Sequence, residues 1–172
     1  MLDILWAEWR NTYLKALSAA PAGLESRSGE PDACLFCRLP TEPLAVAHVL
    51  EVSEHAFSAL NRYPYTSGHV MVAPLRHTAE MADLGEAEVA DVWRLLTRAQ
   101  GALRSAMAPD GFNLGANLGR AAGAGVPGHL HVHLVPRWIG DTNVMSVTAG
   151  ARVMPQSLDD TWAELHGLLE TT

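Results

Sequence analysis

Three histidines alternate along a short apolar run between Gly128 and Arg137. Imidazole is the side chain that can act as a nucleophile, a proton carrier or a metal ligand near neutral pH. In a strand, successive side chains point to opposite faces, so the three rings would share one face about 7 Å apart. Three exposed histidines on an edge strand are the alternative, which the strict alternation disfavours. The candidate residues are His129, His131 and His133.

The two cysteines of the chain form a Cys-x-x-Cys pair, Cys34 and Cys37. This spacing is found in metal half-sites, in redox pairs and in pairs of buried thiols. No βαβ pattern surrounds it, which argues against a thioredoxin-like motif. Zinc requires four nitrogen or sulfur ligands in a tetrahedron, of which this pair would supply two.

Composition predicts one folded domain that handles a small ligand. The chain has 172 residues, of which 48% are hydrophobic and 18% charged, enough for a real core. A net charge of −7 argues against a nucleic acid polymer as partner, although one phosphate group could still be held locally. No apolar run reaches the roughly 18 residues of a membrane helix, so we expect no membrane partner. The first six residues include Asp3 and no basic region, which predicts a cytoplasmic protein without a signal peptide.

The elements that would position the histidines follow from apolar spacing. Residues 1–33 are predicted to form an N-terminal helical arm and a Pro/Gly-rich loop, ahead of a single domain over residues 34–172. Apolar residues at helical spacing predict a long helix over 86–107, with Trp93 as a core anchor. A short helix is expected near Leu158–Leu169. The predicted strands are Ala45–Val52, Ala56–Leu60, His69–Ala73, Phe112–Asn117 and the histidine run. This order predicts an α+β fold with an antiparallel sheet.

Two sequence blocks carry a resemblance to the histidine triad (HIT) nucleotide-binding family. The second block runs from Asn117-Leu118-Gly119 to the His-x-His-x-His-x-x-Pro-Arg run, and the first is Leu60-Asn61-Arg62-Tyr63-Pro64-Tyr65-Thr66-Ser67-Gly68-His69 to Pro74. The similarity covers about residues 34–145. It implies a five-stranded antiparallel sheet with one long and one short helix, and a homodimer whose interface includes the long helix. The run Pro136-Arg137-Trp138-x-Gly140-Asp141-x-Asn143 most resembles the diadenosine-tetraphosphate phosphorylases and related HIT-like hydrolases.

The resemblance implies that His131 attacks the α-phosphorus of a nucleotide and forms a covalent nucleotidyl-histidine. A nucleophile of this kind needs a neutral nitrogen lone pair, which His131 can offer if its other ring nitrogen donates to a carbonyl. His133, on the same face, could donate to the phosphate. By resemblance, Asn61 binds the ribose hydroxyls and Asn117 lies near the ribose or the α-phosphate. His69 lies near the nucleotide by resemblance, with no role assigned to it.

The loop over residues 119–128 is rich in glycine, which lets backbone N–H groups approach a phosphate closely. Gly123 and Gly125 are the substrate-binding candidates, and a plain flexible connector is the alternative. Many family members carry Gln, Ser or Thr at the position of Gly125, where the side chain helps to hold the phosphate or the leaving group. This glycine bears on the reaction rate and on the choice of acceptor more than on the identity of the nucleophile.

Some members of the family complete a Cys-x-x-Cys pair with two histidines, and the matching residues here are His77 and His129. The resemblance therefore implies structural zinc on Cys34, Cys37, His77 and His129. The competing assignment has His129 supporting the strand by hydrogen bonding without a metal. A site with four protein ligands has no open position for a metal-bound water.

The expected function is that of a nucleotidyl transferase or hydrolase. Its substrate would be a dinucleoside polyphosphate or a related nucleoside-phosphate ester, and the acceptor would be phosphate or water. The alternatives are a nucleoside phosphoramidate hydrolase, which would use the same nucleophile, and a nucleotide-binding module with little catalysis, which the glycine at 125 would favour.

Overall fold

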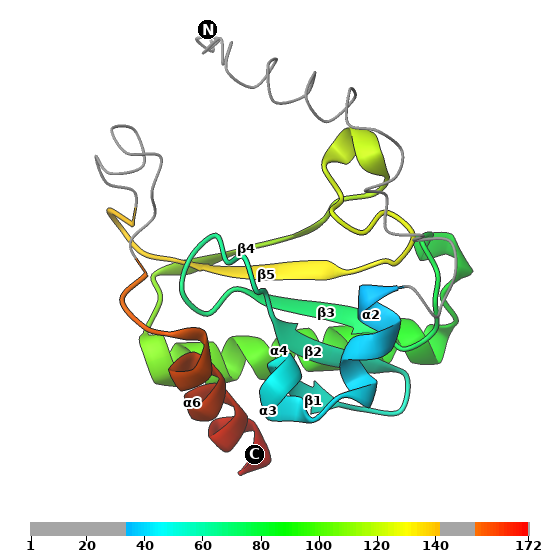
Figure 1. Cartoon of the computed structure of the whole chain (residues 1–172). Helices are drawn as coiled ribbons and strands as arrows, with labels where there is room; N and C mark the ends of the chain where they lie inside the picture. The colour runs from blue at the N-terminus through cyan, green and yellow to red at the C-terminus, as the bar shows by residue number, and fades with distance from the viewer. Residues whose placement is uncertain (1–33, 142–153, 172) are drawn as a thin grey trace, which may run out of the picture.

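A five-stranded antiparallel sheet forms the centre of the molecule, in a computed structural model that describes residues 34–141 and 154–171. The spatial order of the strands is β1-β2-β3-β5-β4 (Figure 1). The bounds are β1 Val49–Val52, β2 Ala56–Leu60, β3 Val70–Pro74, β4 Gly111–Ala116 and β5 Val132–Arg137. This architecture confirms the predicted α+β fold. The predicted N-terminal arm lies outside the described residues.

The long helix α4 spans Glu86–Met107, the range that the apolar spacing predicted. It begins where the carboxylate of Glu88 accepts the N–H of Gly85, and it ends at Ala108, whose backbone is left-handed. Helix α6 spans Leu158–Glu170 and starts at Ser157, whose hydroxyl accepts the N–H of Asp160. The remaining helical segments are short: α2 Leu35–Arg38, α3 Leu44–Ala47, and the 3-10 turns η2 Leu39–Thr41, η3 Met81–Asp83 and η4 Arg120–Ala122.

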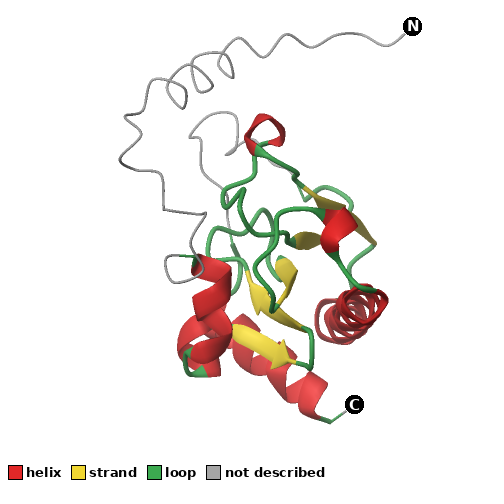
Figure 2. Ribbon diagram, turned by 90° about the vertical axis from the view of Figure 1, so that its right-hand side faces the viewer, coloured by secondary structure: helices red, strands yellow, loops and turns green. Residues whose placement is uncertain are grey.

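Each face of the sheet is covered by a different layer. Figure 2 looks along α4, which lies against one face. The core on that side joins α4 and α6 to strand residues such as Leu60, Val72 and Leu134. The opposite face packs against α2 and α3 through Phe36, Val49, Phe57, Ala59, Met71 and Ala73. The sheet is therefore apolar on both sides, and its second face is the one that receives the histidines.

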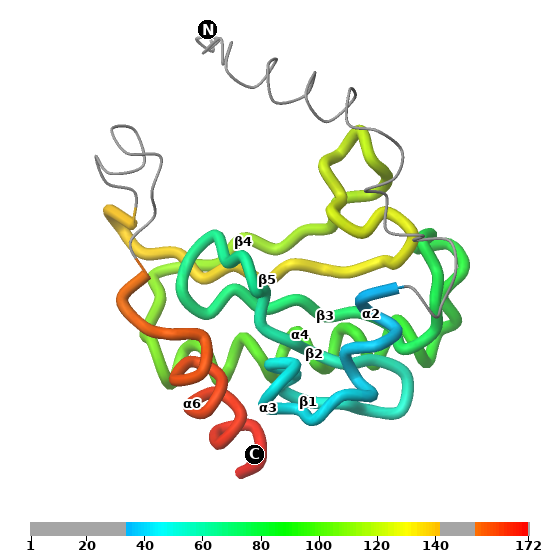
Figure 3. Tube along the Cα trace, viewed as in Figure 1, coloured from blue at the N-terminus to red at the C-terminus, as the bar shows by residue number. Residues whose placement is uncertain are grey.

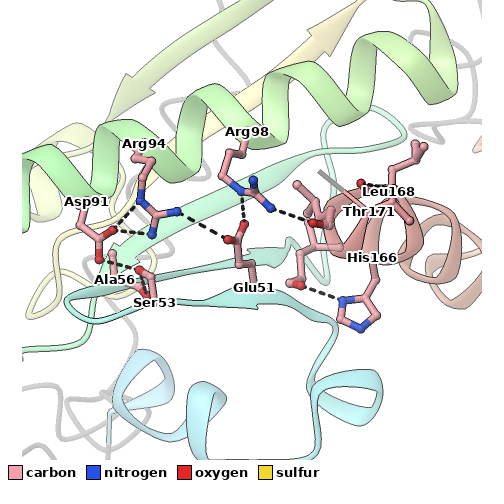
Figure 4. A network of polar contacts seen from close by, with 11 residues as sticks. Glu51, Ser53, Ala56, Asp91, Arg94, Arg98, His166, Leu168 and Thr171 are labelled. Carbon is pink, nitrogen blue, oxygen red and sulfur yellow. Dashed lines mark hydrogen bonds and ion pairs between the residues drawn. The ribbon is translucent and has the colours of Figure 1, made fainter.

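Polar contacts fix α4 and α6 to the edge strand β1 (Figure 4). Arg98 of α4 binds Glu51 of β1 at 3.0 Å and donates to the carbonyl of Leu169 in α6 at 2.7 Å. Trp162 and His166 of α6 donate their ring N–H groups to consecutive carbonyls of β1, those of Val49 and Leu50. Helix α6 thus supplies donors along the outer edge of the sheet.

Three expectations are corrected by the structure. Residues 45–47 belong to helix α3, because the N–H groups of Val46 and Ala47 bond to the carbonyl of Pro43; the predicted strand starts only after His48, whose φ of 52° breaks the helix. Trp93 is 62% exposed, since it lies on the side of α4 that faces away from the core. The histidine run enters the sheet only at Val132.

Between β4 and β5 the chain leaves the sheet as an arch, which Figure 3 shows as a continuous tube. Gly119 and Gly123 have φ values of +74° and +86°, and both flank the η4 turn. The chain returns along Thr78, whose carbonyl accepts the N–H of Leu130 at 2.6 Å. The first two triad histidines therefore lie in the returning segment and the third lies in β5.

Among the helices of the described residues, we find none with the length and apolar character needed to cross a membrane.

Candidate active site

His131 is held in one tautomer by the backbone of its neighbour. Its Nδ1 lies 2.8 Å from the carbonyl oxygen of His129, which can only accept, so Nδ1 carries the proton. The lone pair is then on Nε2, which has no hydrogen-bond partner in the part of the chain that the structure describes. Burial lowers the pKa of His131, and the bond to the carbonyl offsets part of this effect. The ring is therefore neutral and carries an available lone pair near pH 7, as a nucleophile requires.

His133 is connected to the loop between β2 and β3 through His69. The backbone N–H of Tyr65 donates to Nδ1 of His69 at 3.1 Å, and the side-chain amide of Asn61 lies 3.3 Å from the same nitrogen. Since that nitrogen accepts, the proton of neutral His69 is on Nε2. Nε2 of His69 lies 2.9 Å from Nδ1 of His133 and donates to it.

The tautomer of His133 follows from this chain of hydrogen bonds. Its Nδ1 accepts from His69, so its Nε2 carries the proton. Nε2 is buried and has no hydrogen-bond partner within residues 34–141 and 154–171. Burial, followed by the neighbouring His131, lowers the pKa of His133 to about 4. A buried N–H donor without a partner is costly, and a bound ligand atom that accepts from it would remove the cost.

The two rings are adjacent on the face of the sheet away from α4. The ring centroids of His131 and His133 are 5.0 Å apart with an interplanar angle of 75°. His133 pairs with Met71 of β3 and with Gly115 of β4, which fixes its position in the register. A lone pair on one ring and an N–H on the other are thus brought together in His131 and His133.

A cavity of about 950 Å³ opens beside His133. Asn117, one of the predicted substrate-binding residues, lines it together with residues of β4. The lining also includes Tyr65, Thr66, Ser67, Met107, Asn113, Arg137, Trp138, Asp141, Met154 and Gln156. His131 is 5% exposed and is not part of this lining, so the third histidine is the triad member that faces the cavity.

The remaining binding candidates lie outside that cavity. Asn61 accepts the N–H of Tyr63 with Oδ1 at 2.9 Å, which makes it a turn residue, and it lines a smaller hollow of about 510 Å³. Its link to the triad runs through His69. Gly123 and Gly125 are in the arch, where an added Cβ would meet no described atom within 4 Å. The arch thus leaves open space at both glycines.

The four predicted zinc ligands converge. Cys34, Cys37, His77 and His129 each offer one ligand atom, and these atoms all lie within 4.8 Å of one another. Nδ1 of His129 is 3.4 Å from Sγ of Cys34 and 3.5 Å from Sγ of Cys37, while Nδ1 of His77 is 3.3 Å from the latter sulfur. A tetrahedral zinc with ordinary bond lengths would separate sulfur and nitrogen by about 3.6 Å. The donor set and its spacing therefore fit zinc.

The ring of His129 is oriented for such a metal. Its Nε2–H donates to the carbonyl of Pro74 at 2.9 Å, which leaves the lone pair on Nδ1, toward the cysteines. Burial lowers the pKa of His129 to about 4, so the ring is neutral and able to ligate. Neither cysteine takes part in a disulfide, and Cys34 is buried while Cys37 is partly exposed. His129 thus supports the backbone by hydrogen bonding, and its other ring nitrogen is directed at the two cysteines, an arrangement compatible with the proposed metal ligation.

His69 is the functional candidate to which the sequence assigned no role. It is 1% exposed and lies directly before β3. The resemblance placed it near the nucleotide, but its contact with His133 depends on the pairing of β3 with β5, which joins residues 64 positions apart. A lone histidine before an apolar strand gives no indication of which side chain it will meet.

Comparison with known proteins adds a family and several relatives. A family model described as the HIT domain matches residues 43–138. An AP-4-A phosphorylase of Mycobacterium tuberculosis (strain ATCC 25618 / H37Rv) is 37% identical over 160 residues, covering 93% of this chain and 80% of that protein. The nitrilase and fragile histidine triad fusion protein NitFhit of Caenorhabditis elegans is 30% identical over 118 residues, covering 69% of this chain and 26% of that protein.

Among solved structures, a Zn-bound histidine triad family protein from Mycobacterium smegmatis is similar in fold. It matches with a TM-score of 0.66 at 26% sequence identity, covering 83% of this chain and 96% of that chain.

Proposed function

Because the chain belongs to the HIT domain family, we propose that it transfers a nucleotidyl group from a dinucleoside polyphosphate through a covalent intermediate on His131. The observation that carries the proposal is the bond from Nδ1 of His131 to the carbonyl of His129, since it leaves the Nε2 lone pair available. The phosphorylase relative supports diadenosine tetraphosphate as the substrate and inorganic phosphate as the acceptor.

The proposed reaction has two displacements at one phosphorus atom. In the first, Nε2 of His131 attacks the α-phosphorus, a P–N bond forms, and the P–O bond to the leaving nucleoside polyphosphate breaks. In the second, an oxygen of phosphate or water attacks, and the P–N bond breaks. The Nε2–H of His133 donates to a phosphate oxygen, which stabilises the charge that develops there. Asn117 and the cavity backbone hold the nucleotide, and Asn61, Gly123 and Gly125 remain proposed substrate contacts.

We further propose that Cys34, Cys37, His77 and His129 hold structural zinc. With four protein ligands the site is closed, so the metal would stabilise the fold instead of activating water. The site would fix the segment around α2 to the backbone that holds His131. The histidine triad protein of Mycobacterium smegmatis, described as Zn-bound, supports this assignment.

The proposal also includes a homodimer. Strand β4 is an edge strand with Leu114 49% exposed, and α4 exposes Val89 and Trp93. Apolar side chains exposed on an edge strand and on a helix face are typical of a surface that binds another copy. We also propose that residues 1–33 form a separate N-terminal arm and that the protein is cytoplasmic.

The test is product analysis after incubation with diadenosine tetraphosphate, with and without phosphate, by anion-exchange chromatography. ADP plus ATP indicates phosphorolysis, and AMP plus ATP indicates hydrolysis. We expect His131→Asn to bind nucleotide and lose turnover. The matched control is His55→Asn, since the ring of His55 lies 3.7 Å from Glu54 and outside the site. Full activity of His131→Asn would refute the nucleophile, and nucleotide binding without any product from the wild type would favour a binding module.

A further inference from the structure

The Cys-x-x-Cys turn places an aromatic ring on the ring of His131. Phe36 lies between the two cysteines in α2, and its centroid is 4.5 Å from that of His131 with an interplanar angle of 25°. The two rings are therefore stacked. Phe36 is 2% exposed, so this contact is part of the packed interior.

Phe36 also contacts the first triad histidine. Its centroid is 5.4 Å from that of His129 and 6.3 Å from that of Phe57, a neighbour on β2. Cys34, Phe36 and Phe57 belong to one apolar cluster against the second face of the sheet. The Cys-x-x-Cys turn, in which Cys34 is the N-cap of α2 and Cys37 lies within it, therefore carries the ring that covers His131.

Three contacts together restrict the His131 ring. Its Nδ1–H is bonded to the carbonyl of His129, one ring face is covered by Phe36, and His133 approaches at 75°. Rotation about χ2 would break the hydrogen bond and drive the imidazole into the phenyl ring. Rotamer and tautomer are thus constrained jointly, which keeps Nε2 as the one ring nitrogen available for reaction.

We propose that Phe36 is a positioning residue for the nucleophile: it holds the His131 ring in the plane in which Nδ1 bonds to the His129 carbonyl and Nε2 faces the α-phosphorus. The inference rests on the proposed function in taking His131 as the nucleophile. The Cys-x-x-Cys turn would then have a second function besides metal binding: a metal held by the cysteines would fix α2, and α2 would fix the phenyl ring of Phe36 against His131. Catalysis depends strongly on such placement, since a misplacement of about 1 Å can cost about a hundredfold in rate.

The experiment compares Phe36→Leu with Phe57→Leu in the zinc-loaded full chain. Both substitutions remove one buried phenyl ring from the same cluster, but Phe57 has no ring contact with His131 among the described residues. We expect Phe36→Leu to lower kcat about tenfold to a hundredfold with KM changed less than about threefold, and Phe57→Leu to leave kcat within about threefold. Zinc content, measured by mass spectrometry, should equal that of the wild type in both.

A spectroscopic readout separates positioning from general destabilisation. Long-range ¹H–¹⁵N spectra of ¹⁵N-histidine-labelled protein, recorded at one pH without nucleotide, report which ring nitrogen is protonated. We expect His131 to be protonated at Nδ1 in the wild type and in Phe57→Leu, and to show a mixture of tautomers in Phe36→Leu. If Phe36→Leu does not fold, Phe36→Met, whose unbranched side chain is longer and more adaptable, takes its place.

The outcomes are distinct. An unmixed Nδ1–H tautomer together with an unchanged kcat in Phe36→Leu would overturn the positioning role. Equal losses of kcat in the two leucine variants would also overturn it, because they would indicate a cluster effect. A wild type with the expected tautomer but without turnover would refute the proposed function instead, and the spectrum of Phe36→Leu would still decide the role of Phe36.

Discussion

His69 offers the most discriminating perturbation of the site, because it sets the tautomer of His133 without touching His131. Replacing His69 with Met removes the Nε2–H donor and leaves Nδ1 of His133 buried without its partner at 2.9 Å. Replacing it with Gln keeps an amide donor of similar reach. Gln also carries an amide oxygen that can accept, whereas Met offers neither a donor to His133 nor an oxygen to accept the N–H of Tyr65.

The magnitude follows from the hydrogen bond that is lost. A buried polar group left without a partner costs about 1–3 kcal/mol. We therefore expect His69→Met to lower the free energy of unfolding by about 1–3 kcal/mol and His69→Gln to lose clearly less. If the same energy orients the Nε2–H of His133 toward a phosphate oxygen in the transition state, kcat/KM falls about tenfold to a hundredfold in His69→Met, at about 1.4 kcal/mol per factor of ten.

The assay combines urea unfolding with steady-state turnover of diadenosine tetraphosphate. A folded His69→Met protein with wild-type kcat/KM would show that the tautomer of His133 is not set by His69 or does not matter for the reaction. A His69→Gln variant as impaired as His69→Met would show that the donor is not the relevant property. Either result would refute the reasoning from the hydrogen-bond chain.

Three further predictions concern stability. Cys34→Ser is expected to lose bound zinc, measured by mass spectrometry, and to melt at a lower temperature; wild-type metal content would contradict the ligand set. Folding lowers the pKa of His133 to about 4, so on acidification the unfolded chain is protonated at this residue before the folded chain is. The free energy of unfolding should therefore fall as the pH is lowered from 6.5 to 4. Partial solvent screening limits this loss to about 1–2 kcal/mol, and a pH series of His133→Asn in which the loss is undiminished would exclude this origin. Gly68→Ala should cost about 2–4 kcal/mol, because φ is +74° and the added Cβ would lie 2.6 Å from Leu103. Gly140→Ala, with φ +80° and no described atom within 4 Å of the added Cβ, should cost only about 1–2 kcal/mol, and equal losses in urea unfolding would contradict the steric argument.

The sequence predicted the parts of the fold that repeat a simple period. The helix over 86–107 was predicted to its ends, because apolar residues recur regularly and the run Pro109-Asp110-Gly111 follows it. The prediction of a strand at residues 45–47 was wrong, since a short run of apolar residues after Pro43 fits one helical turn as well as a strand. The prediction that Trp93 is a core anchor was wrong, because the presence of an aromatic residue on a helix does not indicate whether another element will cover it.

The candidate site was predictable where the residues are close in the chain or where the resemblance supplied the distant partners. The metal-ligand candidates converged as the resemblance implied, and the alternation of the triad brought His131 next to His133. The supports of these rings were not predictable from spacing. Phe36 and His69 reach them only after α2 packs on the sheet and β3 pairs with β5, and both contacts depend on distances that tertiary structure sets.

The donors that α6 presents to β1 have a consequence for how copies of this chain can aggregate. With the carbonyls of Val49 and Leu50 already occupied by ring N–H groups, that border of the sheet is closed to an incoming backbone. Within the part of the chain that the structure describes, β4 at the far border is then the edge left to recruit another strand. Two molecules joined through β4 would each have used that edge, so this mode of pairing favours a closed dimer over a growing ribbon.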